Sequence, residues 1–147
     1  MTDLEFRTAS IDDVPQLASM NQRLIRDEGH TNPMTLDQLR ERMGDWLQGT
    51  YEGIIAEIGG RPAGYLLFRR EPGFVYVRHL FVDREFRRRG IGRKLLRWLE
   101  RSVLAEPREL RVDALLKNEA GLAFWRAVGF HDYCVTLTKP RPRGPES

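Results

Sequence analysis

The sequence predicts a single α/β (α+β) domain in which helices flank a mixed, mostly antiparallel sheet. Its 147 residues lie near the usual size of one domain and can bury one core. Segments of strand and helix periodicity follow one another without an internal repeat or an interdomain linker. We therefore expect one domain over residues 1–139, followed by a flexible, basic, proline-rich tail over residues 140–147.

The first part of the chain predicts one strand and two helices. Residues 5–9 alternate as a short strand does, and Ser10 or Asp12 can cap the helix that follows. That helix should end at Gly29, because glycine suits the left-handed position after a helix. Thr35 is the expected cap of a second helix with one apolar face.

Three strands are predicted next, over residues 51–58, 63–70 and 74–82. A turn signal at Gly59–Pro62 separates the first two strands, and one at Glu71–Gly73 separates the second from the third. Such short connections favour an antiparallel meander.

The second half of the chain alternates between helix and strand. The pattern predicts a helix over residues 90–106, a strand over 110–116, a helix over 119–128 and a last strand over 132–138. A helix between two strands favours a crossover connection, so part of the sheet should be parallel.

The composition excludes several classes of protein. Hydrophobic residues make up 41% and charged residues 31%, which excludes a disordered chain and a membrane-spanning one. The single cysteine, Cys134, allows neither a disulfide framework nor a cysteine-based zinc site, and we expect no metal. The N-terminal residues lack the pattern of a secretory signal, so we expect no membrane association and a cytoplasmic location.

The segment Asp83–Leu96, "DREFRRRGIGRKLL", combines three arginines with two glycines at the expected start of a helix. Free N–H groups at a helix N-terminus attract anions, and Gly90 and Gly92 would let a phosphate approach the main chain. A dinucleotide-binding fingerprint is excluded because Leu95 stands where its third glycine belongs, and the chain contains no P-loop sequence. The segment therefore indicates an anion site of another kind, or simply a solvated basic helix start.

Two motifs in this order resemble those of the GCN5-related N-acetyltransferases. The run "VRHLFVDREFRRRGIGRKLLRWLE" resembles motif A of that family, and Arg87 to Gly92 fit its signature [RQ]-x-x-G-x-[GA] at every fixed position. Downstream, "NEAGLAFWRAVGF" resembles the second hallmark, an Asn, a small-residue helix and a Gly-Phe pair. The resemblance covers essentially the whole chain.

The resemblance implies acetyl-CoA as cosubstrate, held by a turn that wraps its pyrophosphate and by a central strand that splays from its neighbour. Main-chain N–H groups from Arg88 to Lys94 would hold the pyrophosphate; the side chains of Arg87 and Arg88 would contact phosphate, and Arg89 would face solvent or the 3′-phosphate. The implied cofactor-binding residues are Leu80, Phe81, Val82, Arg87, Arg88, Arg89, Gly90, Ile91, Gly92, Arg93, Lys94, Asn118, Phe124 and Trp125.

The implied reaction is direct transfer of the acetyl group to a primary amine, which needs a base. Asp113 is one candidate, since aspartate is poorly suited to a strand and relatives often carry an acid there. His79 is the other, because an ordinary histidine pKa near ~6.5 suits proton acceptance at neutral pH. An ion pair for Asp113 and a packed, hydrogen-bonded ring for His79 are the structural alternatives.

The sequence departs from the family at the position of the general acid. Many relatives carry Tyr four residues before the Gly of the Gly-Phe pair, where this chain has Trp125, whose indole cannot deliver a proton at useful cost. Water or another hydroxyl, with Tyr133 a distant candidate, would serve instead, or no acid is used. Glu28 and His30 are expected to line the acceptor pocket. A polyamine, an aminoglycoside-like antibiotic, an amino acid and a protein or peptide amine are all possible acceptors, and the acidic residues slightly favour a small cationic amine.

Two other functions compete with an enzyme. A catalytically silent CoA-binding sensor would explain the missing tyrosine. A nucleic-acid-binding module would use "REFRRRGIGRK". The low net charge of +3 weighs against it, and exposed aromatic residues are not interleaved with the basic ones as stacking would require. Relatives often form dimers, so a homodimer is a further expectation.

Overall fold

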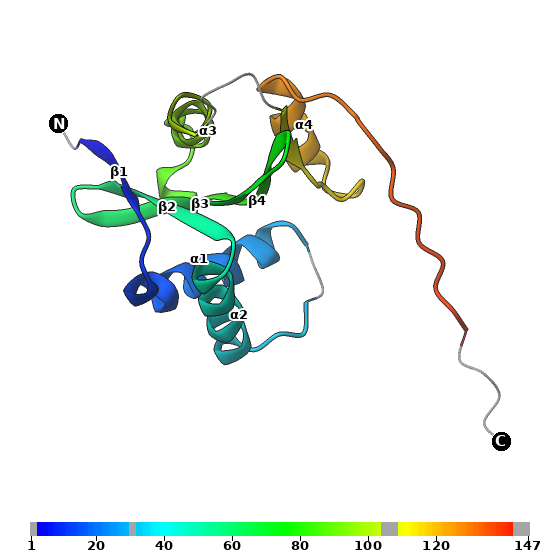
Figure 1. The fold of residues 1–147 in the computed structure, drawn as a ribbon, viewed down its shortest axis with the longest axis horizontal. Helices are drawn as coiled ribbons and strands as arrows, with labels where there is room; N and C mark the ends of the chain where they lie inside the picture. Colours follow the sequence, from blue (N-terminus) through cyan, green and yellow to red (C-terminus); the bar gives the residue numbers. More distant parts are fainter. Residues whose placement is uncertain (1–2, 30–31, 104–108, 143–147) are drawn as a thin grey trace.

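The computed structural model describes residues 3–29, 32–103 and 109–142 as one sheet with helices on both faces (Figure 1). The strands are β1 (Leu4–Thr8), β2 (Tyr51–Ile58), β3 (Arg61–Glu71), β4 (Phe74–Val82) and β5 (Glu109–Val112). The helices are α1 (Val14–Asp27), α2 (Leu36–Gln48), α3 (Ile91–Ser102) and α4 (Glu119–Ala127), with short 3₁₀ turns at Ile11–Asp13 and Arg84–Phe86.

The sheet has the order β1-β2-β3-β4-β5, and its first four strands are antiparallel. β5 pairs in parallel with β4 after the crossover through α3, so the sheet is mixed and mostly antiparallel as the sequence predicts. Gly29 adopts a φ of 71° after α1, which confirms it as the residue that ends the helix. Among the described residues, no helix is long and apolar enough to cross a membrane.

β4 separates from β5 partway along its length. The parallel pairing runs only from Phe74–Glu109 to Val77–Val112, so within the described residues the end of β4 faces no strand on that side. On the other side, Leu67 pairs with His79 and Phe68 pairs with Val77, which leaves Arg78 as the extra residue of a bulge. The splayed central strand therefore follows from a bulge at Arg78 beside the end of the short β5.

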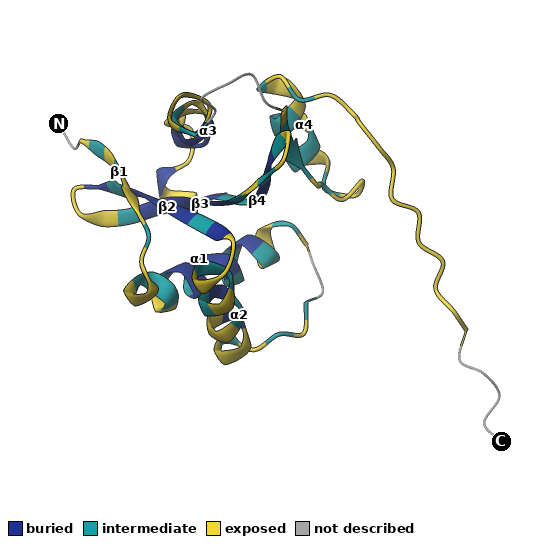
Figure 2. Cartoon of the chain, viewed as in Figure 1, coloured by how far each residue is buried: buried dark blue, intermediate teal, exposed yellow. Residues whose placement is uncertain are grey.

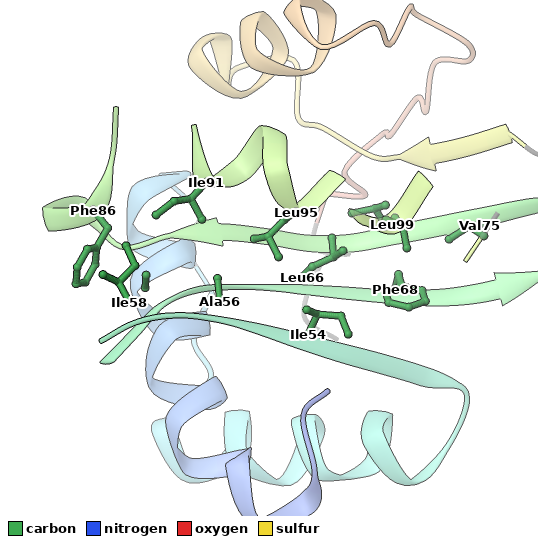
Figure 3. Packing of buried hydrophobic residues seen from close by; sticks show 12 residues of the cluster. Ile54, Ala56, Ile58, Leu66, Phe68, Val75, Phe86, Ile91, Leu95 and Leu99 are labelled. Atoms are coloured by element: carbon green, nitrogen blue, oxygen red, sulfur yellow. The ribbon is translucent and has the colours of Figure 1, made fainter. Parts of the chain in front are cut away.

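Each face of the sheet buries its own core. In Figure 2 the buried residues gather on the central strands and on the sides of the helices that face them. α3 covers one face, where Ile91, Leu95 and Leu99 pack against the sheet (Figure 3). α1 and α2 cover the other face, where their core contributions are Leu17, Met20, Leu24 and Met43. The hydrophobic spacing that predicts these helices is the spacing of the residues they bury.

The predicted strand over residues 132–138 is wrong. These residues are irregular, and the chain runs away from the body of the molecule (Figure 1). Tyr133, Val135 and Leu137 are exposed by 68%, 68% and 89%. Their alternation satisfies the local requirement for a strand, but strand order also needs a paired neighbour. The strand predicted over residues 110–116 is observed as the shorter β5, which ends at Val112.

Candidate functional site

The turn between β4 and α3 presents free main-chain donors. Arg88 and Gly90 both take left-handed backbone conformations, with φ of 67° and 72°. No side chain caps α3, and its first bond within the helix runs from the Lys94 N–H to the Gly90 carbonyl at 3.0 Å. The N–H groups of Ile91, Gly92 and Arg93 therefore have no acceptor inside the helix and lie at its positive end.

Gly92 lies where α3 approaches α4 and β4. A Cβ at this position would be 3.3 Å from the Phe124 ring and 3.8 Å from the Leu80 side chain. Glycine thus leaves the main chain of the first helical turn open, and a larger side chain would fill the same space.

The three arginines of the turn have different surroundings. Arg87 bonds back to the protein: its Nε donates to the Val82 carbonyl at 3.0 Å, and its guanidinium pairs with Asp27 at the end of α1. Arg88 and Arg89 are exposed, and Arg89 stacks over the Phe86 ring with its guanidinium carbon 5.5 Å from the centroid. Arg87 therefore braces the turn, whereas Arg88 and Arg89 present their charges to solvent.

The peptide groups of β4 divide between its two sides. The Asp83 N–H donates to the Ala63 carbonyl of β3 at 2.7 Å. Because peptide direction alternates along a strand, Phe81 also faces β3, and a Cβ on Gly64 would lie only 2.2 Å from the Phe81 carbonyl oxygen. Leu80 and Val82 therefore direct their peptide groups toward the gap that β5 leaves.

α4 borders the same region. The Asn118 side chain caps it by accepting a hydrogen bond from the Gly121 N–H at 3.0 Å. Trp125 is partly buried against the α3-side core and makes edge contacts with Phe124 and Phe130, each with centroids 5.2 Å apart. A pocket of about 340 Å³ lies between α3 and α4, lined in part by Arg93 and Arg97. The aromatic pair Phe124–Trp125 thus joins α4 to the core.

His79 is half-buried on the opposite face of β4. Its Nδ1 and the Tyr65 hydroxyl are hydrogen-bonded at 3.0 Å, and the Trp46 ring packs against it edge-on at 5.4 Å. Burial, together with the charges of Arg42 and Arg78, lowers the pKa of His79 to about 3. The imidazole is therefore neutral at physiological pH and is a weak base.

Asp113 follows β5 at the point where the two strands separate. It is exposed, and its Oδ2 accepts a hydrogen bond of 2.7 Å from the Tyr76 hydroxyl of β4. Burial and the neighbouring carboxylate raise the pKa of Tyr76 to about 12, so the phenol keeps its proton. This bond places Asp113 on the α2 face of β4, beside the mouth of the gap.

Several residues of this face were missed by the sequence analysis. Trp46 and Tyr51 form a tilted aromatic pair, and the side chains of Arg42, Arg69 and Arg78 lie over aromatic rings here. The one available signal was Arg78, a charged residue within the apolar run of β4. Arg42 and Trp46 gave no signal of a site. An amphipathic helix ordinarily carries apolar residues such as Trp46 on one face and charged residues such as Arg42 along its border.

The two predicted acceptor residues come from the end of α1. Glu28 directly follows the helix, and its charge contributes to the raised pKa of the buried Tyr65. His30 lies outside the described residues. No group of three metal-ligating side chains occurs within the described part of the chain.

Comparison with known proteins gives a consistent assignment. The family model described as "Acetyltransferase (GNAT) family" matches residues 17–130. A possible acetyltransferase from Clostridium difficile superposes with a TM-score of 0.80 at 15% identity, covering 96% of this chain and 99% of that one. The aminoglycoside N-acetyltransferase AAC(6')-Iy in complex with CoA gives 0.77 at 17% identity, with 96% of each chain covered.

A third solved structure is nearer in sequence. A GCN5-related N-acetyltransferase from Ralstonia eutropha gives a TM-score of 0.73 at 25% identity, covering 95% of this chain and 99% of that one. No curated protein sequence matches the chain. The solved structures share the fold along nearly its whole length.

Proposed function

The chain belongs to the acetyltransferase (GNAT) family, and from this membership we propose that it transfers an acetyl group from acetyl-CoA directly to a primary amine. The observation that carries the proposal is the uncapped N-terminus of α3 beside the gap between β4 and β5. A diphosphate at that helix end and an extended arm along the gap would satisfy the free donors and the open edge of β4.

The residues of the turn fit such a ligand. The N–H groups from Arg88 to Arg93 would hold the pyrophosphate, with Gly90 and Gly92 keeping side chains out of the way. The Lys94 N–H already donates to the Gly90 carbonyl, so Lys94 would contribute only its exposed side chain. The exposed Arg88 supplies charge, and Arg87 would act by bracing the turn or by exchanging Asp27 for a phosphate. The peptide groups of Leu80 and the N–H of Val82 would bind the pantetheine arm, since the Val82 carbonyl accepts from Arg87. Phe81 would support them through its bonds to β3.

α4 would cover the other side of the cofactor. Asn118 fixes the start of this helix, and Phe124 and Trp125 would line the arm where α4 meets α3. Acetyl-CoA supplies an acetyl group on a thioester, whose carbon–sulfur bond breaks as the bond to the amine nitrogen forms, with release of a thiolate.

Asp113 is the better candidate for the base. An ammonium group must lose a proton before it can attack, and Asp113 is exposed beside the gap, where it can pass that proton to solvent. His79 is fixed by Tyr65 and has a pKa of about 3, which makes it a poor acceptor from an ammonium. We assign His79 a positioning role in the floor of the acceptor site.

The reaction does not require a general acid from α4. Trp125 is packed into the core, and Tyr133 is exposed over Arg111 in the C-terminal segment. A thiol pKa near ~8.5 makes a thiolate a tolerable leaving group, so solvent suffices to protonate it.

The C-terminal segment favours a homodimer. Residues 132–138 have the alternation of a strand without a partner, while β5 forms an edge of the sheet in the described chain. A second copy offers the same segment and the same edge, so two copies can exchange them symmetrically.

The proposed function is tested by following free-thiol release from acetyl-CoA with a panel of amines. Turnover with at least one amine supports an enzyme. Binding of coenzyme A without turnover on any amine favours a silent sensor, and retention on DNA at low salt without cofactor binding favours a nucleic-acid-binding module.

A further inference from the structure

Two arginines share one aromatic ring on the α2 face of the sheet. The guanidinium carbon of Arg42 lies 4.4 Å from the centroid of Trp46, and that of Arg78 lies 4.6 Å from it. Arg42 comes from α2 and Arg78 from β4, so the fold brings like charges together from separate elements. Such an arrangement favours an anion between or beside them.

The protein's own carboxylates do not neutralise this pair. Across the described ranges, no ion pair includes Arg42 or Arg78. The nearby Glu71 pairs with Arg69 at 2.7 Å, and Asp113 accepts from Tyr76. Both arginines therefore keep their charge available.

Arg42 also has an unused donor. Its Nη2 donates to Asn21 at 3.1 Å, but its Nε is buried and has no hydrogen-bond partner within the described structure. Burial and the charge of Arg78 lower the pKa of Arg42. A buried N–H group with no acceptor costs free energy, and an acceptor that reaches it would recover that cost.

The Arg42–Arg78 pair lies beside the gap in which the acceptor amine would react. Arg78 is the bulge residue that directly follows the last β4–β5 pair, and it is exposed. An acceptor that approaches the gap from the α2 face therefore passes Arg78, with the rings of Trp46 and Tyr51 beside it.

We propose that the acceptor is an amino acid whose carboxylate is bound by Arg78 and Arg42 while its amine points into the β4–β5 gap. This inference rests on the proposed function and names its substrate class. It selects the amino acid among the acceptors that the sequence leaves open, whereas the acidic end of α1 slightly favours a small cationic amine. Glu28 would then face the ammonium end of a zwitterion.

The test compares each standard L-amino acid with its own carboxamide in the thiol-release assay. The two molecules share their side chain and stereochemistry but differ in the carboxylate charge and in the pKa of the amine. The decisive quantity is therefore the change in the acid-to-amide ratio of kcat/KM between the wild-type protein and an arginine variant. At least one acid should be acetylated with a kcat/KM about 10-fold or more above that of its amide. In Arg78→Gln, kcat/KM for that acid should fall about 10- to 100-fold, mainly through KM, whereas kcat/KM for the amide should change less than about 2-fold.

Matched variants separate charge recognition from folding. Arg78→Lys should restore part of the loss, and Arg40→Gln on the exposed side of α2 should leave the acid-to-amide ratio unchanged. Arg42→Gln should lower the ratio as Arg78→Gln does. An equal loss for acid and amide in Arg78→Gln would overturn the inference.

The outcomes distinguish this inference from the proposed function. Carboxylate recognition is wrong if amides or polyamines are acetylated with the same kcat/KM as the acids, or if coenzyme A binds and no acid is acetylated. In both cases cofactor binding still stands. If calorimetry detects no binding of coenzyme A, the proposed function fails and the inference fails with it.

Discussion

The Tyr76 hydroxyl donates a 2.7 Å hydrogen bond to Oδ2 of Asp113, linking β4 to the residue that follows β5 where the strands separate. Two features of the site meet in this contact. It fixes the carboxylate beside the gap, and it links that carboxylate to the face that carries Arg78 and Trp46. The contact joins residues 37 positions apart in the chain.

Replacing Asp113 tests its role as base. We expect Asp113→Asn to lower kcat/KM by about 100-fold or more, because the carboxamide cannot accept the proton of the ammonium. Calorimetry should give the same affinity for acetyl-CoA as the wild-type protein. As the matched control, Tyr76→Phe keeps the carboxylate and should cost less activity. Wild-type kinetics in Asp113→Asn would exclude the residue as base.

The lowered pKa of His79 predicts a particular pH dependence of the free energy of unfolding. The pKa of His79 is about 3 in the folded protein and ~6.5 when unfolded, so between these values the unfolded state binds more protons. The free energy of unfolding should therefore fall as pH drops below ~6.5, by up to about 1.4 kcal/mol per pH unit from this residue.

His79→Gln removes that titration and keeps an acceptor for Tyr65. The measurement is urea unfolding between pH 6.5 and 4.5, where Asp13 and Asp132 stay ionised because their arginine partners lower the pKa of each carboxyl. The variant should give a shallower slope. Equal slopes for the two proteins would show that His79 is not held neutral by burial.

Gly64 tests the tight contact between β3 and β4. In Gly64→Ala the new Cβ would meet the Phe81 carbonyl at 2.2 Å, and both groups belong to main chain, so the strands must separate. We expect a loss of about 2–4 kcal/mol in the free energy of unfolding.

The matched control for that substitution is Gly44→Ala within α2. There the nearest atom to the added Cβ is Ile11 Cδ1 at 4.0 Å. Alanine should stabilise the helix by about 0.5–1 kcal/mol. Denaturation midpoints that move the same way in both variants would contradict the close approach of β3 and β4.

The C-terminal segment predicts the oligomeric state. Light scattering should give twice the 17.1 kDa mass of the chain, and a protein truncated after His131 should give the mass of a monomer. A monomeric full-length chain would show that Tyr133, Val135 and Leu137 stay exposed or pair within their own molecule.

Patterns of residues close together in the chain predict most of the helices and strands. The helix caps at Thr35 and Gly29 and the turns of the β2–β4 meander lie where the sequence places them, because these features depend on residues close together in the chain. The strand predicted over residues 132–138 failed for the opposite reason. Its alternation is local, but its pairing depends on an edge elsewhere.

The site likewise contains residues that are contiguous in the chain and residues that only packing brings together. The glycines and arginines of the turn are contiguous, so the sequence indicates an anion site there. The grouping of Arg42, Trp46 and Arg78 depends on how α2 packs against β4, and the low pKa of His79 depends on that packing. No spacing rule within one element reports such contacts.

Calorimetric titration of the wild-type protein and Gly92→Val with acetyl-CoA tests the central claim, that the N-terminus of α3 binds the cofactor's diphosphate. We predict one molecule bound per wild-type chain and about 10-fold or weaker binding to Gly92→Val, whose side chain would fill the space beside Phe124 and Leu80. Circular dichroism should show that the variant is folded. No heat of binding in the wild-type protein, or equal affinity in a folded Gly92→Val, would contradict the account.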